Sequence, residues 1–108
     1  MKYYIVEIEF PFTEKIGSKM IPALLLTKPQ TKFGHVLVAF ITSKIPKQLE
    51  VSDLKIEPSP INQLKIPSVI RLSKIISREI SQVTGIIGEL SEEETLQIKT
   101  KLQHLFEI

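Results

Sequence analysis

The sequence of 108 residues contains no cysteine, no tryptophan and only two histidines. Without cysteine the chain can form neither a disulfide bond nor a thiolate nucleophile or metal ligand. His35 and His104 fall on different predicted elements, so we expect no structural zinc site. We also expect no other metal site and no cofactor. The lack of tryptophan means that any recognition by aromatic stacking would be modest.

Long apolar runs are also absent. The longest one is far shorter than the roughly 18 residues that a membrane-spanning helix requires. Near the N-terminus, Glu7 and Glu9 interrupt the apolar stretch that a signal peptide would need. We therefore expect a cytoplasmic protein with no membrane contact.

Acidic residues are missing from a third of the chain. Residues 15–49 contain no aspartate or glutamate but six lysines, and residues 1–50 as a whole carry seven lysines against four glutamates. Residues 51–108 carry seven basic against eight acidic residues. A concentration of positive charge suits a polyanion such as RNA, although a solvated lysine face is an open alternative. The six lysines are Lys15, Lys19, Lys28, Lys32, Lys44 and Lys47.

Apolar residues make up 43% and charged residues 24%, which is typical of a single globular domain over residues 1–108. Alternating or continuous apolar runs predict strands at residues 3–10, 21–27 and 35–43, with a loop over 12–20. The second and third runs are almost wholly apolar, so we place them at the centre of the sheet. Further strands are predicted at 51–57, as a short edge strand, at 67–72 with an extension through 76, and at 83–90, where Gly85 and Gly88 indicate a bend or a bulge.

The chain ends in a predicted helix. Ser91 and Glu94 form a capping-box pattern, and apolar residues recur at helical spacing behind it. That apolar stripe should pack on the sheet or on a second subunit. Short strands followed by one helix predict a mostly β fold: a compact, SH3-like small barrel over about residues 3–90 and a helix over about 92–107. The stripe consists of Ile98, Leu102, Leu105 and Phe106.

Several short segments occur in an order and spacing that are more specific than any one of them. They are Phe10-Pro11-Phe12-Thr13, Gly17-Ser18-Lys19, Pro22-Ala23-Leu24-Leu25-Leu26, Ile41-Thr42-Ser43, Lys65-Ile66-Pro67-Ser68-Val69-Ile70-Arg71-Leu72 and Ile87-Gly88-Glu89-Leu90-Ser91. Taken together they resemble the MazF/PemK toxin family, and the resemblance covers nearly the whole chain.

The resemblance implies a dimeric, SH3-like barrel that acts as the toxin of a type II toxin–antitoxin pair. Such a toxin is a sequence-selective endoribonuclease that cuts single-stranded mRNA without a metal ion. The resemblance also implies an antitoxin whose acidic tail covers the basic groove for RNA. An acidic peptide and an RNA strand would compete for the same lysines.

Three residues are candidates for the chemistry. Cleavage of RNA without a metal requires the 2′-hydroxyl to be deprotonated, the leaving oxygen to be protonated and the charge on the phosphorane to be stabilised. Thr42 and Ser43 match the family's polar pair at the end of the third strand, where their hydroxyls are expected to bind the scissile phosphate. Their structural alternative is to cap that strand. Lys19 lies in the predicted loop beside the expected site and is the third candidate for binding the phosphate; its alternative is a solvated loop lysine.

One position departs from the family. The residue before the proline of the second strand is usually a catalytic arginine, and here Ile21 precedes Pro22. Isoleucine cannot bind a phosphate, and Lys19 lacks the planar fork of arginine. The sequence therefore leaves two main interpretations, an active endoribonuclease and a catalytically impaired relative that binds RNA or an antitoxin peptide without cleavage. A third, a plain SH3-like protein-interaction module, is supported only by size and fold.

The remaining candidates concern RNA binding. Lysines within residues 15–49 would contribute phosphate contacts that weaken with salt. Phe33 and its neighbour Lys32 are predicted to form a stacking surface for single-stranded bases, unless Phe33 plugs the end of the barrel. Arg71 would contact RNA or pair with a carboxylate across the sheet. The lysines assigned to phosphate contacts are Lys15, Lys28, Lys44 and Lys47.

Overall fold

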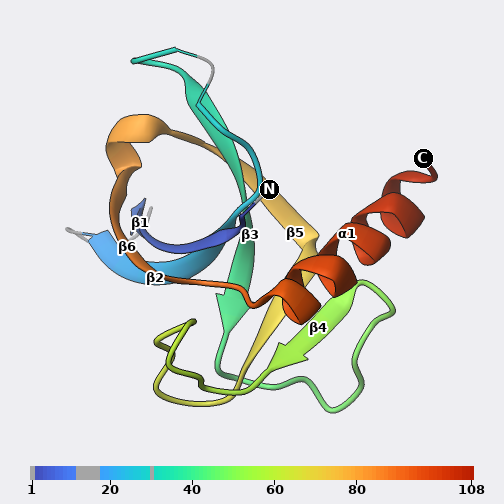
Figure 1. The fold of residues 1–108 in the computed structure, drawn as a ribbon. Coiled ribbons are helices and arrows are strands. Elements are labelled where there is room, and N and C mark those ends of the chain that lie inside the picture. Colours follow the sequence, from blue (N-terminus) through green and yellow to red (C-terminus); the bar gives the residue numbers. More distant parts are fainter. Residues whose placement is uncertain (1, 12–17, 30) are drawn as a thin grey trace.

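A computed structural model describes residues 2–11, 18–29 and 31–108 of the chain. The described residues form six strands, one short 3-10 helix and one α-helix (Figure 1). Every pair of neighbouring strands is antiparallel, in the order β4-β5-β3-β2-β1-β6. The elements are β1 (Tyr4–Pro11), β2 (Ser18–Leu25), β3 (His35–Thr42), β4 (Asp53–Ile56), β5 (Ser68–Glu79), η1 (Ile80–Gln82), β6 (Val83–Glu89) and α1 (Glu92–Phe106).

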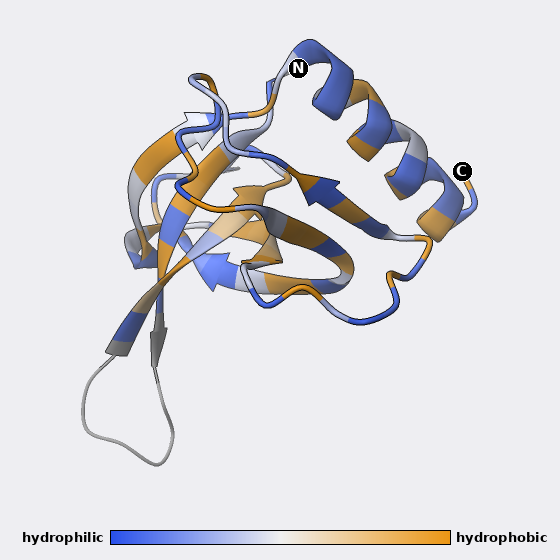
Figure 2. Cartoon of the chain, turned by 90° about the horizontal axis from the view of Figure 1, so that it is seen from below, coloured by the Kyte–Doolittle hydropathy of each residue, from blue (hydrophilic) through white to orange (hydrophobic). Residues whose placement is uncertain are grey.

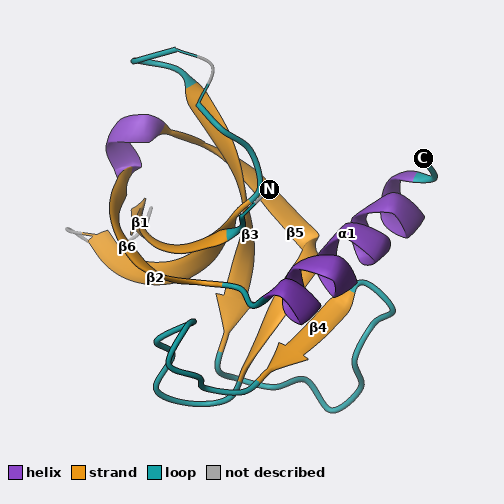
Figure 3. Cartoon of the chain, viewed as in Figure 1, coloured by secondary structure: helices purple, strands orange, loops and turns teal. Residues whose placement is uncertain are grey.

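The sheet curls into a small barrel-like ring, as the sequence predicts, although its two edge strands do not pair with each other. β4 and β6 lie at opposite edges of the strand order. Figures 1 and 3 show β5 running through η1 into β6, which pairs with β1 on the other side of the ring. The chain itself, and not a hydrogen-bonded ladder, therefore closes the ring at this point.

Irregular pairing accounts for the strong curvature. Ala39 of β3 lies opposite Ile75 of β5, whereas the next residue, Phe40, lies opposite Arg71. Residues 72–74 therefore have no partner on β3, and a bulge of this kind bends a strand and increases its twist. The β1–β6 ladder shifts register twice as well, in the segment that contains Gly85 and Gly88, where the sequence predicted a bulge.

Two apolar cores lie on opposite faces of the curled sheet. Along β3, Val36 and Val38 belong to one core, while Ala39 and Ile41 belong to the other. This alternation explains why the sequence of β3 is almost continuously apolar: each face is covered along part of its length. β2 and β3 lie at the centre of the sheet, as predicted. Figure 2 shows the apolar residues distributed along the strands, with many hydrophilic residues on α1.

Helix α1 begins at the predicted capping box. The Ser91 hydroxyl accepts the Glu94 N–H at 3.1 Å, and the Glu94 carboxylate accepts the Ser91 N–H at 2.8 Å. Ile98 is fully buried in the core with β4, but Leu105 and Phe106 are 38% and 56% exposed. The predicted apolar stripe thus packs on the sheet only in its first half. A 15-residue helix is about 22 Å long, whereas the four-residue strand β4 beside it spans only about 13 Å.

Several predicted boundaries were wrong. Strand β2 begins at Ser18, inside the predicted loop, because residues 18–20 continue the ladder with β1. It ends at Leu25, and the Thr27 side chain beyond it accepts the Leu37 N–H at 3.0 Å. β4 is shorter than predicted because a turn, in which the Asp53 N–H donates to the Glu50 carbonyl, precedes it. β5 extends to Glu79.

No helix in the described part of the chain has the length and apolar character needed to cross a membrane.

The burial of Ile98 generates a stability prediction. Replacing Ile98 with Ala removes side-chain atoms that are fully buried between α1 and the sheet, and we expect it to lower the free energy of unfolding by about 2–5 kcal/mol. Leu96→Ala is the matched control on the same helix, because Leu96 is 65% exposed; it should change stability by less than about 0.5 kcal/mol. Urea denaturation of both variants measures the difference, and equal effects would contradict this placement of the helix.

Candidate functional site

A groove opens where two central strands separate. β2 and β3 pair at only three positions, the last of which joins Ala23 to Phe40. Beyond that pair, β2 continues along β1 and β3 continues along β5. The space between the diverging strands is a groove of about 690 Å³. Its position therefore follows from the choice of partner that each strand makes.

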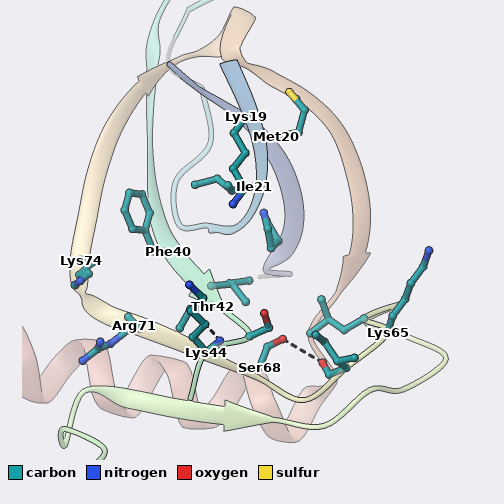
Figure 4. Close-up of a pocket in the computed structure, with 15 residues that line it drawn as sticks. Lys19, Met20, Ile21, Phe40, Thr42, Lys44, Lys65, Ser68, Arg71 and Lys74 are labelled. Atoms are coloured by element: carbon teal, nitrogen blue, oxygen red, sulfur yellow. Dashed lines mark hydrogen bonds between the residues drawn. The ribbon is translucent and has the colours of Figure 1, made fainter. Parts of the chain in front are cut away.

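Side chains from three parts of the chain line this groove. Figure 4 shows Lys19, Met20 and Ile21 on the β2 side, Phe40 and Thr42 on the β3 side, and residues of β5 and the preceding loop completing the wall. The lining residues are Lys19, Met20, Ile21, Pro22, Phe40, Ile41, Thr42, Ser43, Lys44, Leu64, Lys65, Ile66, Ser68, Arg71 and Lys74.

The lining is strongly basic. It contains one arginine and four lysines and, among the residues that the structure describes, no aspartate or glutamate. Within residues 2–11, 18–29 and 31–108, none of the four lysines forms an ion pair with a carboxylate. Charges of one sign that gather in a concave site raise the local concentration of oppositely charged ligands. The groove is thus suited to an anionic chain. The four lysines are Lys19, Lys44, Lys65 and Lys74.

Arg71 differs from these lysines because it is paired. Its Nε donates to Asp53 Oδ1 at 3.1 Å, its Nη2 donates to Asp53 Oδ2 at 3.4 Å, and Glu50 Oε2 lies 3.6 Å from Nη2. Of the two alternatives raised for Arg71, the structure shows the pairing with a carboxylate across the sheet. The Asp53 side chain is fully buried.

The three predicted catalytic residues lie in the same groove. The Thr42 hydroxyl accepts the Lys44 N–H at 3.1 Å, which is the strand-end role named as its structural alternative. Because a hydroxyl has one donor in addition to its lone pairs, Thr42 can still donate to a ligand. Ser43 is exposed and follows directly, and Lys19 faces the groove from β2. Lys19 lies on a strand and not in the predicted loop.

Other predicted RNA contacts lie elsewhere. Lys28, Lys32 and Phe33 belong to the β2–β3 connection, at the end of β3 opposite to Thr42. Eight strand residues separate the two ends by about 23 Å, at about 3.3 Å per residue. Phe33 is 84% exposed, so it does not plug the barrel, and Lys32 Nζ lies 5.7 Å from the centre of its ring. Lys47 is exposed and does not line the groove; Lys15 lies outside the described residues.

Sequence reasoning did not assign Lys65, Lys74 or Phe40 to the site. Lys65 reaches the groove on the β4–β5 loop, and Lys74 reaches it on the bulge of β5. Neither lysine lies within residues 15–49, so the lack of acidic residues in that segment did not indicate them. Phe40 sits in an apolar run and is indistinguishable there from a core residue.

The loop that carries Lys65 is held by a buried asparagine. Asn62 is fully buried, and its Oδ1 accepts the backbone N–H groups of Ser59 and Leu64, each at 2.9 Å. Its Nδ2 donates to the Glu57 carbonyl at 2.8 Å. The loop also rests on β6, where a Cβ added to Gly88 would lie 2.3 Å from the Asn62 carbonyl oxygen. A glycine is required at this close approach.

Known proteins resemble this chain in sequence and in fold. Residues 2–106 match the model of a family described as PemK-like, MazF-like toxin of type II toxin-antitoxin system. A solved structure titled Mycobacterium tuberculosis toxin MazF-mt6 superposes with a TM-score of 0.73 at 20% identity, covering 97% of each chain. Another, titled Crystal structure of Mtb toxin, gives 0.70 at 19% identity, covering 93% of this chain and 97% of that one. Identities this low demonstrate the fold alone. No curated protein matches the chain.

The contact between β6 and the Asn62 loop can be tested with two glycines of one strand. Gly88→Ala places a methyl group against the loop backbone, and we expect it to cost about 1–3 kcal/mol of stability because that backbone must move. Gly85→Ala is the control, since a Cβ there has no heavy atom within 4 Å. Thermal denaturation compares the two, and a Gly88→Ala protein as stable as Gly85→Ala would contradict the close packing.

Proposed function

The chain belongs to the PemK-like, MazF-like toxins of type II toxin–antitoxin systems, and from this premise we propose that it is an endoribonuclease that cuts single-stranded RNA in the groove between β2 and β3. One observation carries the proposal. The groove brings Thr42, Ser43 and Lys19 together with three further lysines and contains no acidic lining residue in the part of the chain that the structure describes. Hydroxyl donors and positively charged side chains are the groups that stabilise the charge on a phosphodiester during its cleavage.

The reaction that fits these groups uses the 2′-hydroxyl of RNA as the nucleophile. The 2′-hydroxyl loses its proton as its oxygen attacks phosphorus, the bond to the 5′-oxygen breaks while that oxygen gains a proton, and a 2′,3′-cyclic phosphate and a 5′-hydroxyl result. Thr42 and Ser43 would donate hydrogen bonds to the non-bridging oxygens, and Lys19 and Lys44 would offset the charge that grows on them. Ammonium groups supply this positive charge without a metal ion.

The proposal includes two partners. An antitoxin with an acidic tail would occupy the same lysines and exclude RNA, because both ligands are anionic chains. A second copy of the chain would bury apolar side chains of α1 that the single chain leaves exposed, such as Leu105 and Phe106. Sequence selectivity would come from the groove walls that the bases contact.

A second candidate function is favoured by the surroundings of Ile21. This residue lines the groove and packs against one of the two cores, so an apolar side chain stands where the family has an arginine. The groove then lacks one planar donor group close to Thr42. A relative that binds RNA or an antitoxin peptide without cutting RNA would have this composition, with a groove that keeps its charge and loses catalytic power.

The first test is RNA cleavage in EDTA with three proteins. We expect the natural protein to release discrete fragments from a long unstructured RNA, and Thr42→Val to lower the rate roughly 100- to 1,000-fold, since it removes a donor at the charge that develops. Thr42→Ser is the matched control, because it keeps the hydroxyl; it should retain most of the activity. Fragments that survive Thr42→Val unchanged would remove Thr42 from the chemistry, and intact RNA with the natural protein would favour the second candidate.

The second test restores the guanidinium. We expect Ile21→Arg to raise the cleavage rate roughly 10- to 1,000-fold, since the new donor lies in the groove beside the proposed scissile phosphate. The aliphatic part of the arginine can cover the core that Ile21 covers now. Ile21→Met is the control for packing and should leave the rate near that of the natural protein. If Ile21→Arg folds and does not exceed Ile21→Met, other residues already supply the function of the arginine.

A further inference from the structure

We propose that Arg71 holds an RNA phosphate at the β5 rim of the groove, and that Glu50 occupies its guanidinium until RNA replaces it. The inference rests on the proposed function and deepens it, because it assigns a phosphate subsite and a competing carboxylate. Four observations carry it: the register across the sheet, the burial of Asp53, the exposure of Glu50 and the position of Lys74.

The register places Arg71 on the face of the sheet that lines the groove. Ala23, Phe40, Arg71 and Asp53 lie directly opposite one another on four successive strands. Residues that are directly opposite in adjacent antiparallel strands project to the same face. Arg71 therefore stands between Phe40, which lines the groove, and Asp53, which lies on the edge strand β4.

Asp53 fixes the guanidinium. Two parallel contacts, at 3.1 and 3.4 Å, join the carboxylate to Nε and Nη2 of Arg71, and the Asp53 side chain has no exposed surface. Asp53 also accepts the Glu50 N–H at 2.8 Å. Separating a buried pair leaves an uncompensated charge, so RNA would not displace Asp53. Instead Asp53 holds the fork of Arg71 in one orientation, and the ordering cost of binding is reduced.

Glu50 makes the opposite kind of contact. Its carboxylate lies 3.6 Å from Nη2 of Arg71 and accepts a hydrogen bond from the Ser73 hydroxyl at 2.9 Å, and its side chain is 57% exposed. Exposed ion pairs of this kind contribute little and are readily exchanged. Carboxylates and phosphates bind the guanidinium fork with the same geometry, and a phosphate can make bidentate contacts. Glu50 does not itself line the groove, so the phosphate oxygen that replaces it at Nη2 would lie at the rim.

The neighbouring wall supports the assignment. Arg71 is 20% exposed and is the arginine among the groove residues, and Lys74 lies on the same side of the cavity in Figure 4. One phosphate at this rim would contact a fixed fork and a flexible ammonium group. Ile21 provides no guanidinium on β2. Arg71 would thus provide one on β5, at the other wall of the same groove.

The experiment measures binding of a 2′-O-methyl RNA oligonucleotide, which cannot be cleaved, by fluorescence anisotropy at low salt. We expect Glu50→Gln to bind about three- to fivefold more tightly than the natural protein, because the phosphate no longer competes with a carboxylate. Glu57→Gln is the matched control: Glu57 is also an exposed glutamate in an ion pair, with Lys55 at 3.8 Å. Its effect should stay below about twofold.

A second set of variants distinguishes the replacement of Glu50 on Arg71 by a phosphate from a general loss of repulsion between the protein and RNA. In an Asp53→Asn, Arg71→Met protein, which loses both members of the buried pair together, Glu50→Gln should tighten binding no more than Glu57→Gln does. An equal gain from Glu50→Gln in both backgrounds would overturn the inference. If the double substitution does not fold, the comparison of Glu50→Gln with Glu57→Gln in the natural background decides alone, since both residues are exposed.

The outcomes also separate this inference from the proposed function. RNA binding with equal effects of Glu50→Gln and Glu57→Gln overturns the role of Arg71 and leaves the endoribonuclease proposal intact. If neither the natural protein nor either variant binds the oligonucleotide, the proposed function fails and the subsite fails with it. Tighter binding that is specific to Glu50→Gln and disappears without Arg71 supports the subsite, whether or not the natural protein cleaves RNA.

Discussion

The separation of β2 from β3 after the Ala23–Phe40 pair is the constraint on which the rest of the site depends. A strand can pair with a neighbour on each of its two edges. Beyond the Ala23–Phe40 pair, each of the two strands is paired only on its outer edge, β2 with β1 and β3 with β5. The inner edges face one another across the groove. Every proposed catalytic residue lies on one of these two edges or at the end of one. A continued β2–β3 ladder would have filled the space that a ligand needs.

The fold prevents the gap from closing. The bulge at residues 72–74 of β5 lies opposite the point where β3 leaves β2, and apolar cores pack on both faces of the sheet. At the end of the groove, the loop that contains Asn62 forms a wall that rests on Gly88 of β6. These restraints use apolar packing and backbone hydrogen bonds. The groove can therefore carry unpaired lysines, whose mutual repulsion would otherwise favour a more open structure.

The sequence predicted the parts of the structure that depend on local pattern. The order of the strands along the chain, the central position of β2 and β3 and the capping box of Ser91 and Glu94 follow from periodicity and residue type. The resemblance pointed to Thr42 and Ser43, which line the groove. It could not show that Lys65 and Lys74 join them, because these lysines enter the groove through a loop and a bulge whose geometry is set by distant contacts. Conversely, Lys28 and Lys32 are near the site in sequence, and the length of β3 separates them from it.

The pairing of Asp53 with Arg71 shows why the charge of a groove cannot be read from its composition alone. Four of its cations are lysines on flexible stems, and they attract an anion without fixing its position. The fifth has its fork held by a buried carboxylate, so part of its charge is already balanced while its orientation is set. Attraction and positioning are thus assigned to different residues. The groove thus has an apolar side chain at position 21 on one wall and a guanidinium of fixed orientation on the other, where the pairing of β4 with β5 places Asp53 opposite Arg71.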